Sequence, residues 1–376
     1  MRTYNVAILG HGFMGRAHSN AWLQANRFFD LPARPALKVA CGRDEVTTKD
    51  FADRWGWEET AENWRTVIDR EDIDIIDIAL PQHLHKEAAV LAAKAGKHIF
   101  CEKPLCLTTQ EAEQMIEEAE LSDVVHYLNH NYRRVPAVQL ARQLIEEGAI
   151  GTIYHWRSAY QQSWLTNPEF PLNWKLKKET AFAGPHIDLN SHSVDLALYL
   201  VGDISTVSCL TSNFIRERPL AEDPNRKGEV TVEDTSLMMV EFESGAVGSF
   251  ESTRFATGRR NHHTFEIYGS EGSLCFNLED MNRLQFYSHA DPEHTRGFHN
   301  ILATERVHPY CSNWWPPGHI IGYEHTFVHA AADFLTAVDS RGTISPNFHD
   351  GFKNVQVLEA GLRSASSGRQ ERVGNS

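Results

Sequence analysis

Residues 6–15 of this 376-residue chain are Val-Ala-Ile-Leu-Gly-His-Gly-Phe-Met-Gly, four apolar residues followed by glycines at positions 10, 12 and 15. The apolar run has the composition of a buried strand, and the residues after Gly15 have the pattern of an amphipathic helix. Glycines between a strand and a helix permit a tight turn and let the backbone approach a pyrophosphate. The stretch therefore predicts an N-terminal domain that binds a dinucleotide cofactor.

Strand and helix patterns alternate up to about residue 130, which predicts a parallel sheet built through right-handed crossovers. We expect strands at residues 5–9, 37–41, 73–79, 98–101 and 124–128. We expect helices between them at residues 15–24, 47–55, 85–95 and 109–121. These elements define a first domain over residues 1–130.

The second part of the chain follows a different pattern, in which strands succeed one another without helices between them. A helix at 135–147 leads into expected strands at residues 152–161, 205–214, 236–242, 246–253, 263–268 and 273–276. Further helices are expected at 187–201, 324–340 and 352–364. This pattern predicts an α+β domain over residues 131–376 with a mainly antiparallel sheet, whose last helix packs back on the first domain.

The bulk composition restricts the partners and the compartment. With 36 basic and 50 acidic side chains, the net charge of -14 argues against nucleic acid and against an anionic membrane as partners. The chain has no signal-peptide pattern and no apolar run near the ~20 residues of a membrane span. The six cysteines are scattered without a C-x-x-C pair, so we expect free thiols in a cytoplasmic protein that acts on a small molecule.

The triplet Glu102-Lys103-Pro104 follows the expected strand at 98–101. An open parallel sheet binds its ligands at the carboxyl ends of its strands, so Lys103 is expected at the site of chemistry. Leu80, Pro81 and His85 follow another strand and should face the nicotinamide half of the cofactor, although His85 could instead only cap or pack its helix.

The end of the second strand bears on the choice between NAD and NADP. An acidic residue commonly binds the adenosine ribose here, but this chain has Cys41-Gly42-Arg43-Asp44. Arg43 suits a 2′-phosphate or the adenine ring, and Asp44 could still serve NAD. Both cofactors therefore remain open.

Four sequence elements together resemble the glucose-fructose oxidoreductase, inositol 2-dehydrogenase and rhizopine-catabolism family, written Gfo/Idh/MocA. They are the glycine motif at 10–15, the stretch 95–104 ending in Glu-Lys-Pro, Asn-Tyr-Arg-Arg-Val-Pro at 131–136, and Asp-Leu-Asn-Ser-His at 188–192 followed by Asp195. The resemblance covers most of the chain. It implies a Rossmann domain followed by a domain whose open sheet often forms oligomers, so a homo-dimer or homo-tetramer is expected, and it favours NAD.

The resemblance also implies the catalytic residues Lys103, Asp188 and His192. Residues four apart lie on one face of a helix, so Asp188 and His192 should reach one substrate together. His192 would accept the hydroxyl proton, Lys103 would stabilise the alkoxide, and Asp188 would orient the sugar or the histidine. Asp188 as a helix N-cap and His192 as a core residue are the structural alternatives, and no metal site is expected.

Residues expected at the cofactor are Gly10, Gly12, Phe13, Met14, Gly15, Gly42, Arg43, Leu80, Pro81, His85, Glu102, Lys103 and Asn131. Aromatic and hydrogen-bonding residues around the expected site helix suit the apolar face and the hydroxyl groups of a sugar. The residues expected at the substrate are Lys103, Trp164, Trp174, Lys175, His186, Asp188, His192, His319 and Tyr323.

These observations predict an NAD(P)-dependent dehydrogenase that acts on a secondary alcohol of a sugar, polyol or glycoside. The alternative is a redox-neutral NAD-dependent glycoside hydrolase or epimerase that works through a transient keto-sugar, because it would need the same residues. A non-catalytic sensor with this fold is a third class, and the presence of all three candidate catalytic residues argues against it. The sequence leaves the sugar and the oxidised carbon open.

Overall fold

The computed structural model describes residues 1–374 and divides the chain into two compact units. The first unit comprises Met1–Arg134 and Ile321–Phe352, and the second comprises Val135–Ile320 and the residues from Lys353 onward. The sequence-based boundary at residue 130 lies near the first crossing, whereas the segment 321–352 groups with the first unit. The chain therefore leaves the first unit, builds most of the second, and returns.

The first unit is a six-stranded parallel sheet with helices, and its strand order is β3-β2-β1-β4-β5-β6. Its strands are β1 (Arg2–Leu9), β2 (Ala33–Cys41), β3 (Glu59–Ala61), β4 (Ile75–Ile78), β5 (His98–Glu102) and β6 (His126–Asn129). Its helices are α1 (Phe13–Phe28), α2 (Glu45–Trp55), α3 (Trp64–Ile68), α4 (His85–Lys94), α5 (Thr109–Leu121) and α10 (Tyr323–Ser340). This order confirms the predicted Rossmann domain. The direction of the strand order reverses between β1 and β4, and such sheets bind their ligands at this point.

Burial explains why the central strands of this sheet were recognisable from sequence. All four residues of β4 are buried, as are the last four of β1, because helices cover both faces of a parallel sheet. Helix α10 returns to pack against α1, where Phe334 contacts Trp22. The three-residue strand β3 has no such apolar signal and was not predicted.

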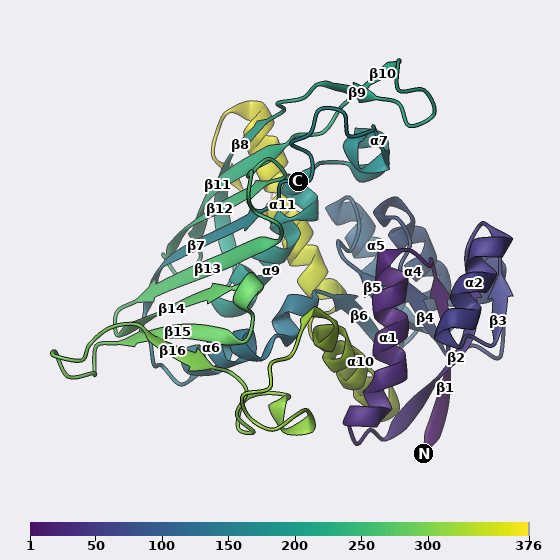
Figure 1. The fold of residues 1–376 in the computed structure, drawn as a ribbon, viewed down its shortest axis with the longest axis horizontal. Helices are drawn as coiled ribbons and strands as arrows, with labels where there is room; N and C mark the ends of the chain where they lie inside the picture. Colours follow the sequence, from purple (N-terminus) through teal and green to yellow (C-terminus); the bar gives the residue numbers. More distant parts are fainter. Residues whose placement is uncertain (375–376) are drawn as a thin grey trace. The chain divides into compact units, whose positions relative to one another are not determined.

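The second unit is organised around a nine-stranded sheet of order β16-β15-β14-β13-β7-β12-β11-β8-β17 (Figure 1). Its strands are β7 (Ile153–Gln161), β8 (Ile204–Ser212), β11 (Thr235–Phe242), β12 (Val247–Thr253), β13 (His262–Gly269), β14 (Gly272–Asn277), β15 (Arg283–Ser288), β16 (His299–Leu302) and β17 (Glu371–Arg372). A separate hairpin contains β9 (Glu217–Pro219) and β10 (Lys227–Glu229). Only the β7–β12 pair of the large sheet is parallel, so the prediction of a mainly antiparallel sheet is confirmed.

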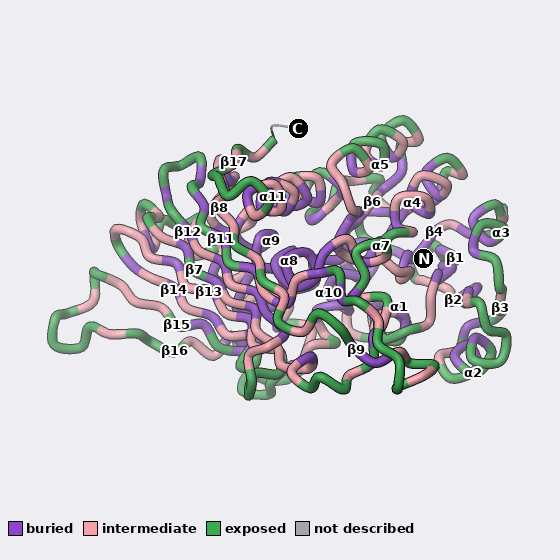
Figure 2. The backbone as a smooth tube through the Cα atoms, turned by 90° about the horizontal axis from the view of Figure 1, so that it is seen from above, coloured by how far each residue is buried: buried purple, intermediate pink, exposed green. Residues whose placement is uncertain are grey.

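The two faces of this sheet differ in their surroundings. Helices α6 (Pro136–Glu146), α9 (Asn190–Leu200) and α11 (Phe348–Ser367) are its main long helices, and α6 and α9 contact the sheet on one face. Burial alternates residue by residue along β11, and Figure 2 shows the strands of this sheet as a mixture of buried and less buried residues. The opposite face carries exposed apolar side chains, among them Leu210, Leu237 and Met239.

The helix expected at 187–201 is two helices, α8 (Pro185–Asp188) and α9, separated at Leu189. The backbone N–H of Leu189 still bonds to Pro185 four residues back, but that of His192 bonds to Leu189 only three residues back. The hydrogen-bond ladder therefore changes between Asp188 and His192. The argument that these two residues share one helical face is wrong, because they belong to different helices.

Two further findings concern the described residues 1–374. None of their helices combines the length and the hydropathy needed to cross a membrane. No disulfide joins any of the six cysteines.

Candidate active site

The glycine turn after β1 is closed by backbone packing. Gly10 has a φ of +102°, and a Cβ there would lie 2.5 Å from the carbonyl oxygen of Ala79. A Cβ on Gly15 would collide with the carbonyl oxygen of Gly10. These two positions therefore require glycine so that α1 can begin close against the ends of β1 and β4.

Gly12 has a different surrounding. It is the N-cap of α1, and a Cβ on it would meet no atom of the described chain within 4 Å. Because glycine has no side chain, the N-cap offers no side-chain acceptor to the N–H groups of the first helical turn. This open helix N-terminus fits the pyrophosphate of NAD(P). Phe13 beside it is 60% exposed and stacks on Tyr323, with the ring centroids 6.2 Å apart.

The end of β2 places Gly42, Arg43 and Asp44 in sequence before α2. The Asp44 carboxylate caps α2 by accepting hydrogen bonds from the backbone N–H of Thr47 at 2.8 Å and from its hydroxyl at 2.7 Å. These hydrogen bonds, the one from the hydroxyl first, lower the pKa of Asp44. Arg43 is exposed. Asp44, the acidic residue nearest the expected ribose position, thus serves as the N-cap of α2.

The loops after β4 and β5 are joined by His85. Its ring nitrogens lie 2.8 Å from the carbonyl oxygen of Pro104 and 2.9 Å from that of Leu80. Burial lowers the pKa of His85, which is 1% exposed. The ring therefore links Leu80, after β4, to Pro104, the residue that follows Lys103.

Lys103 follows the last residue of β5. Its backbone N–H donates to the Glu102 carboxylate at 3.2 Å. The neighbouring His130 is 1% exposed, and its pKa is lowered by burial first and then by the charges of Arg133 and Lys103. Asn131, expected at the cofactor, donates from its side-chain amide to the hydroxyl of Thr326 on α10 at 2.8 Å.

In the second unit, Asp188 lies between two cations. Nη2 of Arg254 is 2.7 Å from Oδ2 of Asp188, and Nζ of Lys175 is 3.7 Å from the same atom. The Arg254 side chain is 1% exposed, whereas that of Asp188 is 25% exposed. The carboxylate is thus anchored from the protein side and remains accessible to a hydroxyl group.

Two tryptophans cover these cations. The guanidinium carbon of Arg254 lies 5.3 Å from the centre of the Trp164 ring, and Nζ of Lys175 lies 5.5 Å from that of Trp174. Cation–π contacts of this kind hold both partners in place. The structure therefore brings together Trp164, Trp174, Lys175 and Asp188, four of the residues expected at the substrate.

His192 lies in the first turn of α9 and is 6% exposed. Its ring centroid is 5.8 Å from that of Tyr160, and Tyr160 in turn stacks on His263 at 4.5 Å. Burial, followed by the charge of His262, lowers the pKa of His263 to about 3. His192 therefore packs against an aromatic pair whose histidine, His263, is uncharged near neutral pH.

The remaining residues expected at the substrate have other surroundings. His186 is fully buried, with its ring nitrogens 2.8 Å from the Ser236 hydroxyl and 2.8 Å from the Leu358 carbonyl. His319 is exposed and contacts the Pro316 carbonyl of its own turn at 2.9 Å. Tyr323 belongs to the first unit, beside Phe13.

Sequence reasoning missed Arg254, and the available signal was weak. Arg254 directly follows the strand β12, and its partner Asp188 is 66 residues away. A basic residue at a strand end is usually solvated, so only the tertiary structure shows that this one is buried.

Comparison with known proteins identifies the family. The family model described as an oxidoreductase family with an NAD-binding Rossmann fold, GFO/IDH/MocA, matches residues 4–130, and a GFO/IDH/MocA C-terminal domain model matches residues 138–275. The chain belongs to this family.

Relatives support the assignment over the full length. Levoglucosan dehydrogenase of Pseudarthrobacter phenanthrenivorans is 42% identical over 97% of each chain. The structure of levoglucosan dehydrogenase in complex with NADH and levoglucosan is 42% identical, covers 100% of both chains and has a TM-score of 0.96. An oxidoreductase domain protein from Kribbella flavida has a TM-score of 0.97 at 43% identity over 100% of both chains.

These findings confirm the family resemblance, the NAD(P) cofactor and the prediction of an NAD(P)-dependent sugar dehydrogenase.

Proposed function

We propose that this enzyme oxidises a secondary hydroxyl group of levoglucosan, or of a sugar closely similar to it, with NAD as the hydride acceptor. The observation that supports this substrate most strongly is the full-length similarity to a levoglucosan dehydrogenase whose solved structure contains NADH and levoglucosan. The anchored Asp188 and the two tryptophans beside it are consistent with a sugar ligand, since indole rings pack on apolar sugar faces.

We assign the chemistry to Lys103, Asp188 and His192. NAD, when bound at the glycine turn, supplies the hydride acceptor. His192 accepts the proton of the reacting hydroxyl, because imidazole is an effective base near neutral pH. The ammonium group of Lys103 stabilises the alkoxide that develops as the proton leaves. Asp188 accepts a hydrogen bond from a sugar hydroxyl while Arg254 fixes its orientation.

The cofactor residues in this proposal are those of the glycine turn and of the strand ends β2, β4 and β5. Gly10, Gly12 and Gly15 shape the pyrophosphate site, with Phe13 and Met14 in the first turn of α1. Arg43 and Asp44 lie at the adenosine end, and NADP is the alternative that Arg43 would favour.

The test is a direct assay of the purified chain with levoglucosan and either NAD or NADP. We expect reduced cofactor to accumulate and a keto-sugar to appear in the mass spectrum in equal amount. Lys103→Met should lower kcat by about 10²- to 10³-fold. Wild-type activity in Lys103→Met would refute the assignment. Consumption of sugar without reduced cofactor would instead support the redox-neutral alternative.

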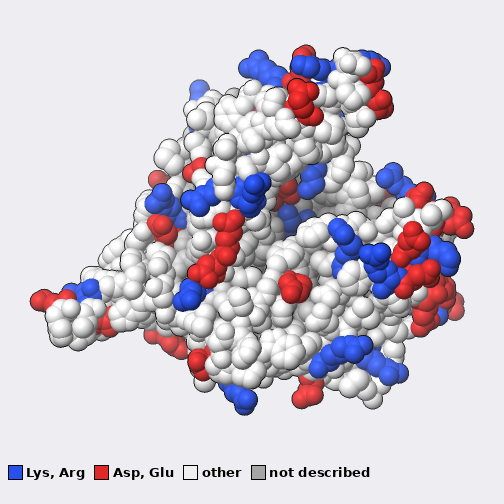
Figure 3. Space-filling model, viewed as in Figure 1, with Lys and Arg blue, Asp and Glu red and all other residues white. Residues whose placement is uncertain are grey.

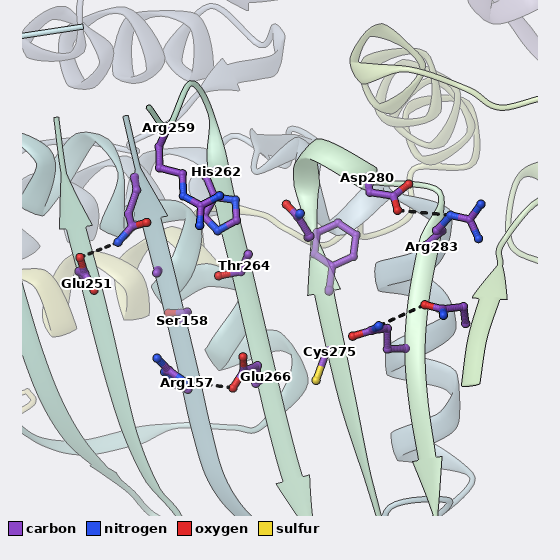
Figure 4. A pocket seen from close by; sticks show the side chains of 16 residues that line it. Arg157, Ser158, Glu251, Arg259, His262, Thr264, Glu266, Cys275, Asp280 and Arg283 are labelled. Atoms are coloured by element: carbon purple, nitrogen blue, oxygen red, sulfur yellow. Dashed lines mark hydrogen bonds and ion pairs between the residues drawn. The ribbon is translucent and has the colours of Figure 1, made fainter. Parts of the chain in front are cut away.

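We further propose that the exposed face of the nine-stranded sheet joins two copies of this chain. Leu210, Met239 and Val247 on this face are 66%, 68% and 50% exposed, and such apolar side chains are usually covered in an assembly. Figure 4 shows the polar part of the same face, where Arg157 lies 3.5 Å from Glu266. Opposite charges side by side suit a two-fold interface, because each copy can meet the complementary charge of the other.

Light scattering after gel filtration tests this interface. We expect a dimer or tetramer for the wild type and a smaller species for Met239→Glu, with Val46→Glu as a control because Val46 is a similarly exposed residue, 69%, on α2 of the first unit. A monomeric wild type would refute the proposal.

The absence of disulfides among the cysteines favours a reducing compartment such as the cytoplasm.

A further inference from the structure

A buried cluster of charged groups lies beneath Lys103, in the first unit. His18 and Trp22 are four residues apart and share one face of α1. Nδ1 of His18 is 2.7 Å from Oδ1 of Asp77, and the indole N–H of Trp22 donates to Oδ2 of Asp77 at 2.7 Å. Asp77 is 0% exposed and sits in the middle of the buried strand β4. Each of its carboxylate oxygens thus has a partner on α1.

The second ring nitrogen of His18 contacts the neighbouring strand. Its Nε2 lies 2.9 Å from Oε1 of Glu102, the last residue of β5. The amide of Asn129, the last residue of β6, donates to the same oxygen at 2.7 Å. The amide nitrogen of Asn129 also lies 3.2 Å from Nε2 of His18, so the imidazole contacts the carboxyl ends of two adjacent strands, β5 and β6.

This geometry determines the protonation state of His18. Ionised carboxylates only accept hydrogen bonds, and a neutral imidazole has a single N–H. Both ring nitrogens face carboxylates, so both carry hydrogen when the two carboxylates are ionised, and the ring is an imidazolium. Burial opposes the charge, but Asp77 and then Glu102 outweigh it and raise the pKa of His18 to about 10.

The surroundings of the cluster strengthen its electrostatics. The ring of Phe100 meets that of His18 edge-on at 5.2 Å, and Phe327 lies 5.6 Å away. Phe100 and Phe327 are both buried, so water does not screen the charges and ion pairs are stronger than at the surface.

The cluster is linked directly to Lys103. The other carboxylate oxygen of Glu102, Oε2, accepts the backbone N–H of Lys103 at 3.2 Å. Two carboxylates and one imidazolium carry one net negative charge. Burial raises the pKa of Glu102, but His18 and then the charge of Lys103 outweigh burial and lower it. Other titratable groups that interact with Glu102 are His85, His130 and Tyr323. Burial lowers the pKa of both histidines, so neither can replace His18 as a cation.

We propose that His18 is a positioning residue for hydride transfer: its imidazolium ties Glu102 to Asp77 and so fixes the backbone and the charge environment of Lys103. This inference rests on the proposed role of Lys103. It adds a residue of helix α1, outside the glycine motif itself, to those on which the reaction depends.

The decisive variant is His18→Gln, which retains a polar side chain but cannot carry a charge. With levoglucosan and NAD, we expect kcat to fall on the order of 10²-fold, because small displacements of reacting groups have effects of that size. The KM for levoglucosan and the dissociation constant of NADH, followed by its fluorescence, should change much less than kcat. A loss confined to cofactor binding would contradict a role through Lys103.

The pH dependence of kcat/KM separates positioning from simple loss of structure. Without a shared cation, two neighbouring buried carboxylates cannot both stay ionised, so one takes up a proton. His18→Gln should therefore gain an acid-side ionisation that the wild type lacks. The double variant His18→Gln/Glu102→Gln should lose that ionisation again, since no titrating carboxylate remains at position 102.

Trp22→Phe is the matched control, because it removes the other donor to Asp77 from the same helix face and leaves the imidazolium intact. It should keep the wild-type shape of the pH profile. An unchanged pH profile and kcat in His18→Gln, or the same new ionisation in Trp22→Phe, would overturn the proposal.

A measurement on the wild type covers the case in which His18→Gln does not fold. In ¹⁵N spectra of histidine-labelled protein at pH 8.5, a pH well above the ordinary histidine pKa of about 6.5, we expect one histidine ring to remain protonated at both nitrogens. Finding none would refute the inference. Lys103→Met in the activity assay with levoglucosan and NAD distinguishes the two proposals. Wild-type activity in Lys103→Met refutes the proposed role of Lys103, whereas an inactive Lys103→Met together with wild-type activity in His18→Gln refutes only the positioning role.

Discussion

Replacing Arg254 by methionine would test how Asp188 is held in its working orientation. Methionine preserves most of the buried volume and the contact with Trp164, but it removes the guanidinium that lies 2.7 Å from the carboxylate. Lys175 remains as a second cation, with its Nζ at 3.7 Å. The variant therefore leaves Asp188 charged and accessible, with a weaker and more flexible partner.

The size of the effect follows from the burial of the two side chains. Hydrogen bonds to charged groups contribute about 1.5 to 3 kcal/mol. The Asp188 side chain is 25% exposed, so water replaces part of the lost interaction, and we take about 2 kcal/mol as the cost. At about 1.4 kcal/mol per factor of ten, kcat/KM for levoglucosan should fall roughly 30-fold.

The assay is the initial rate of NADH formation over a range of levoglucosan concentrations. Lys175→Met is the comparison, because Lys175 contacts the same oxygen atom but is 40% exposed. An exposed ion pair contributes about 0 to 1 kcal/mol, so this variant should lose no more than about fivefold. Urea unfolding of both variants would show whether a fall in rate only reflects a fall in the folded fraction.

The relative losses of kcat/KM in Arg254→Met and Lys175→Met show which cation holds Asp188. If Lys175→Met were the more damaging change, Asp188 would be held chiefly from the solvent side. If Arg254→Met kept kcat/KM within about threefold, the buried arginine would serve packing alone and the reasoning would be wrong.

Two further predictions concern stability and pH. The folded pKa of His18 is raised to about 10. Its ion pairs therefore contribute fully to the free energy of unfolding below the unfolded pKa of about 6.5, and this contribution is lost as the pH rises towards 10. Thermal unfolding at pH 6 and pH 9 should show the loss in the wild type but not in His18→Gln. Burial opposes the ionisation of Asp350, but Arg133 at 3.1 Å and further hydrogen bonds lower its pKa. The ion pair of Asp350 with Arg133 therefore contributes to the free energy of unfolding above the unfolded pKa of about 3.9, and this contribution is lost as the pH falls through the folded pKa. Arg133→Met should therefore cost about 2 kcal/mol in urea unfolding at pH 7 and much less near pH 2, and an equal cost at both pH values would contradict the assignment.

The parallel sheet was predictable because its signals are local. Strands buried on both faces are mostly apolar, and Asp44 and Thr108, which directly precede helices α2 and α5, cap them with their side chains. The glycine turn was equally visible, since the chain geometry at Gly10 admits no other residue without strain.

The features that the sequence did not reveal depend on contacts between distant residues. His18 meets Asp77 and Glu102 across 59 and 84 positions, and no pattern within α1 distinguishes it from an ordinary helix residue. The strands β15 and β16 lie on the outer part of the second sheet, and their partial burial blurs the alternation that marks a strand. The break at Leu189 arises in a stretch that is buried on all sides, where a helical period gives no warning.

Charge on the surface was anticipated in sign but not in arrangement. Figure 3 shows basic and acidic side chains interspersed over one face of the molecule, without a large basic area of the kind that nucleic acid requires. On this face acidic and basic side chains are neighbours, although the whole chain has a net charge of -14.

The return of the chain to the first unit has a consequence for its biosynthesis. Helix α10 supplies Phe327 and Phe334, which pack against His18 and Trp22 of α1. A ribosome translates all of residues 135–320 before it reaches this helix. The nascent N-terminal segment therefore waits, with the apolar side of α1 uncovered, until almost the whole polypeptide has emerged. A fragment that ends at residue 134 should consequently aggregate when expressed, whereas the same fragment joined through a short linker to residues 321–352 should fold.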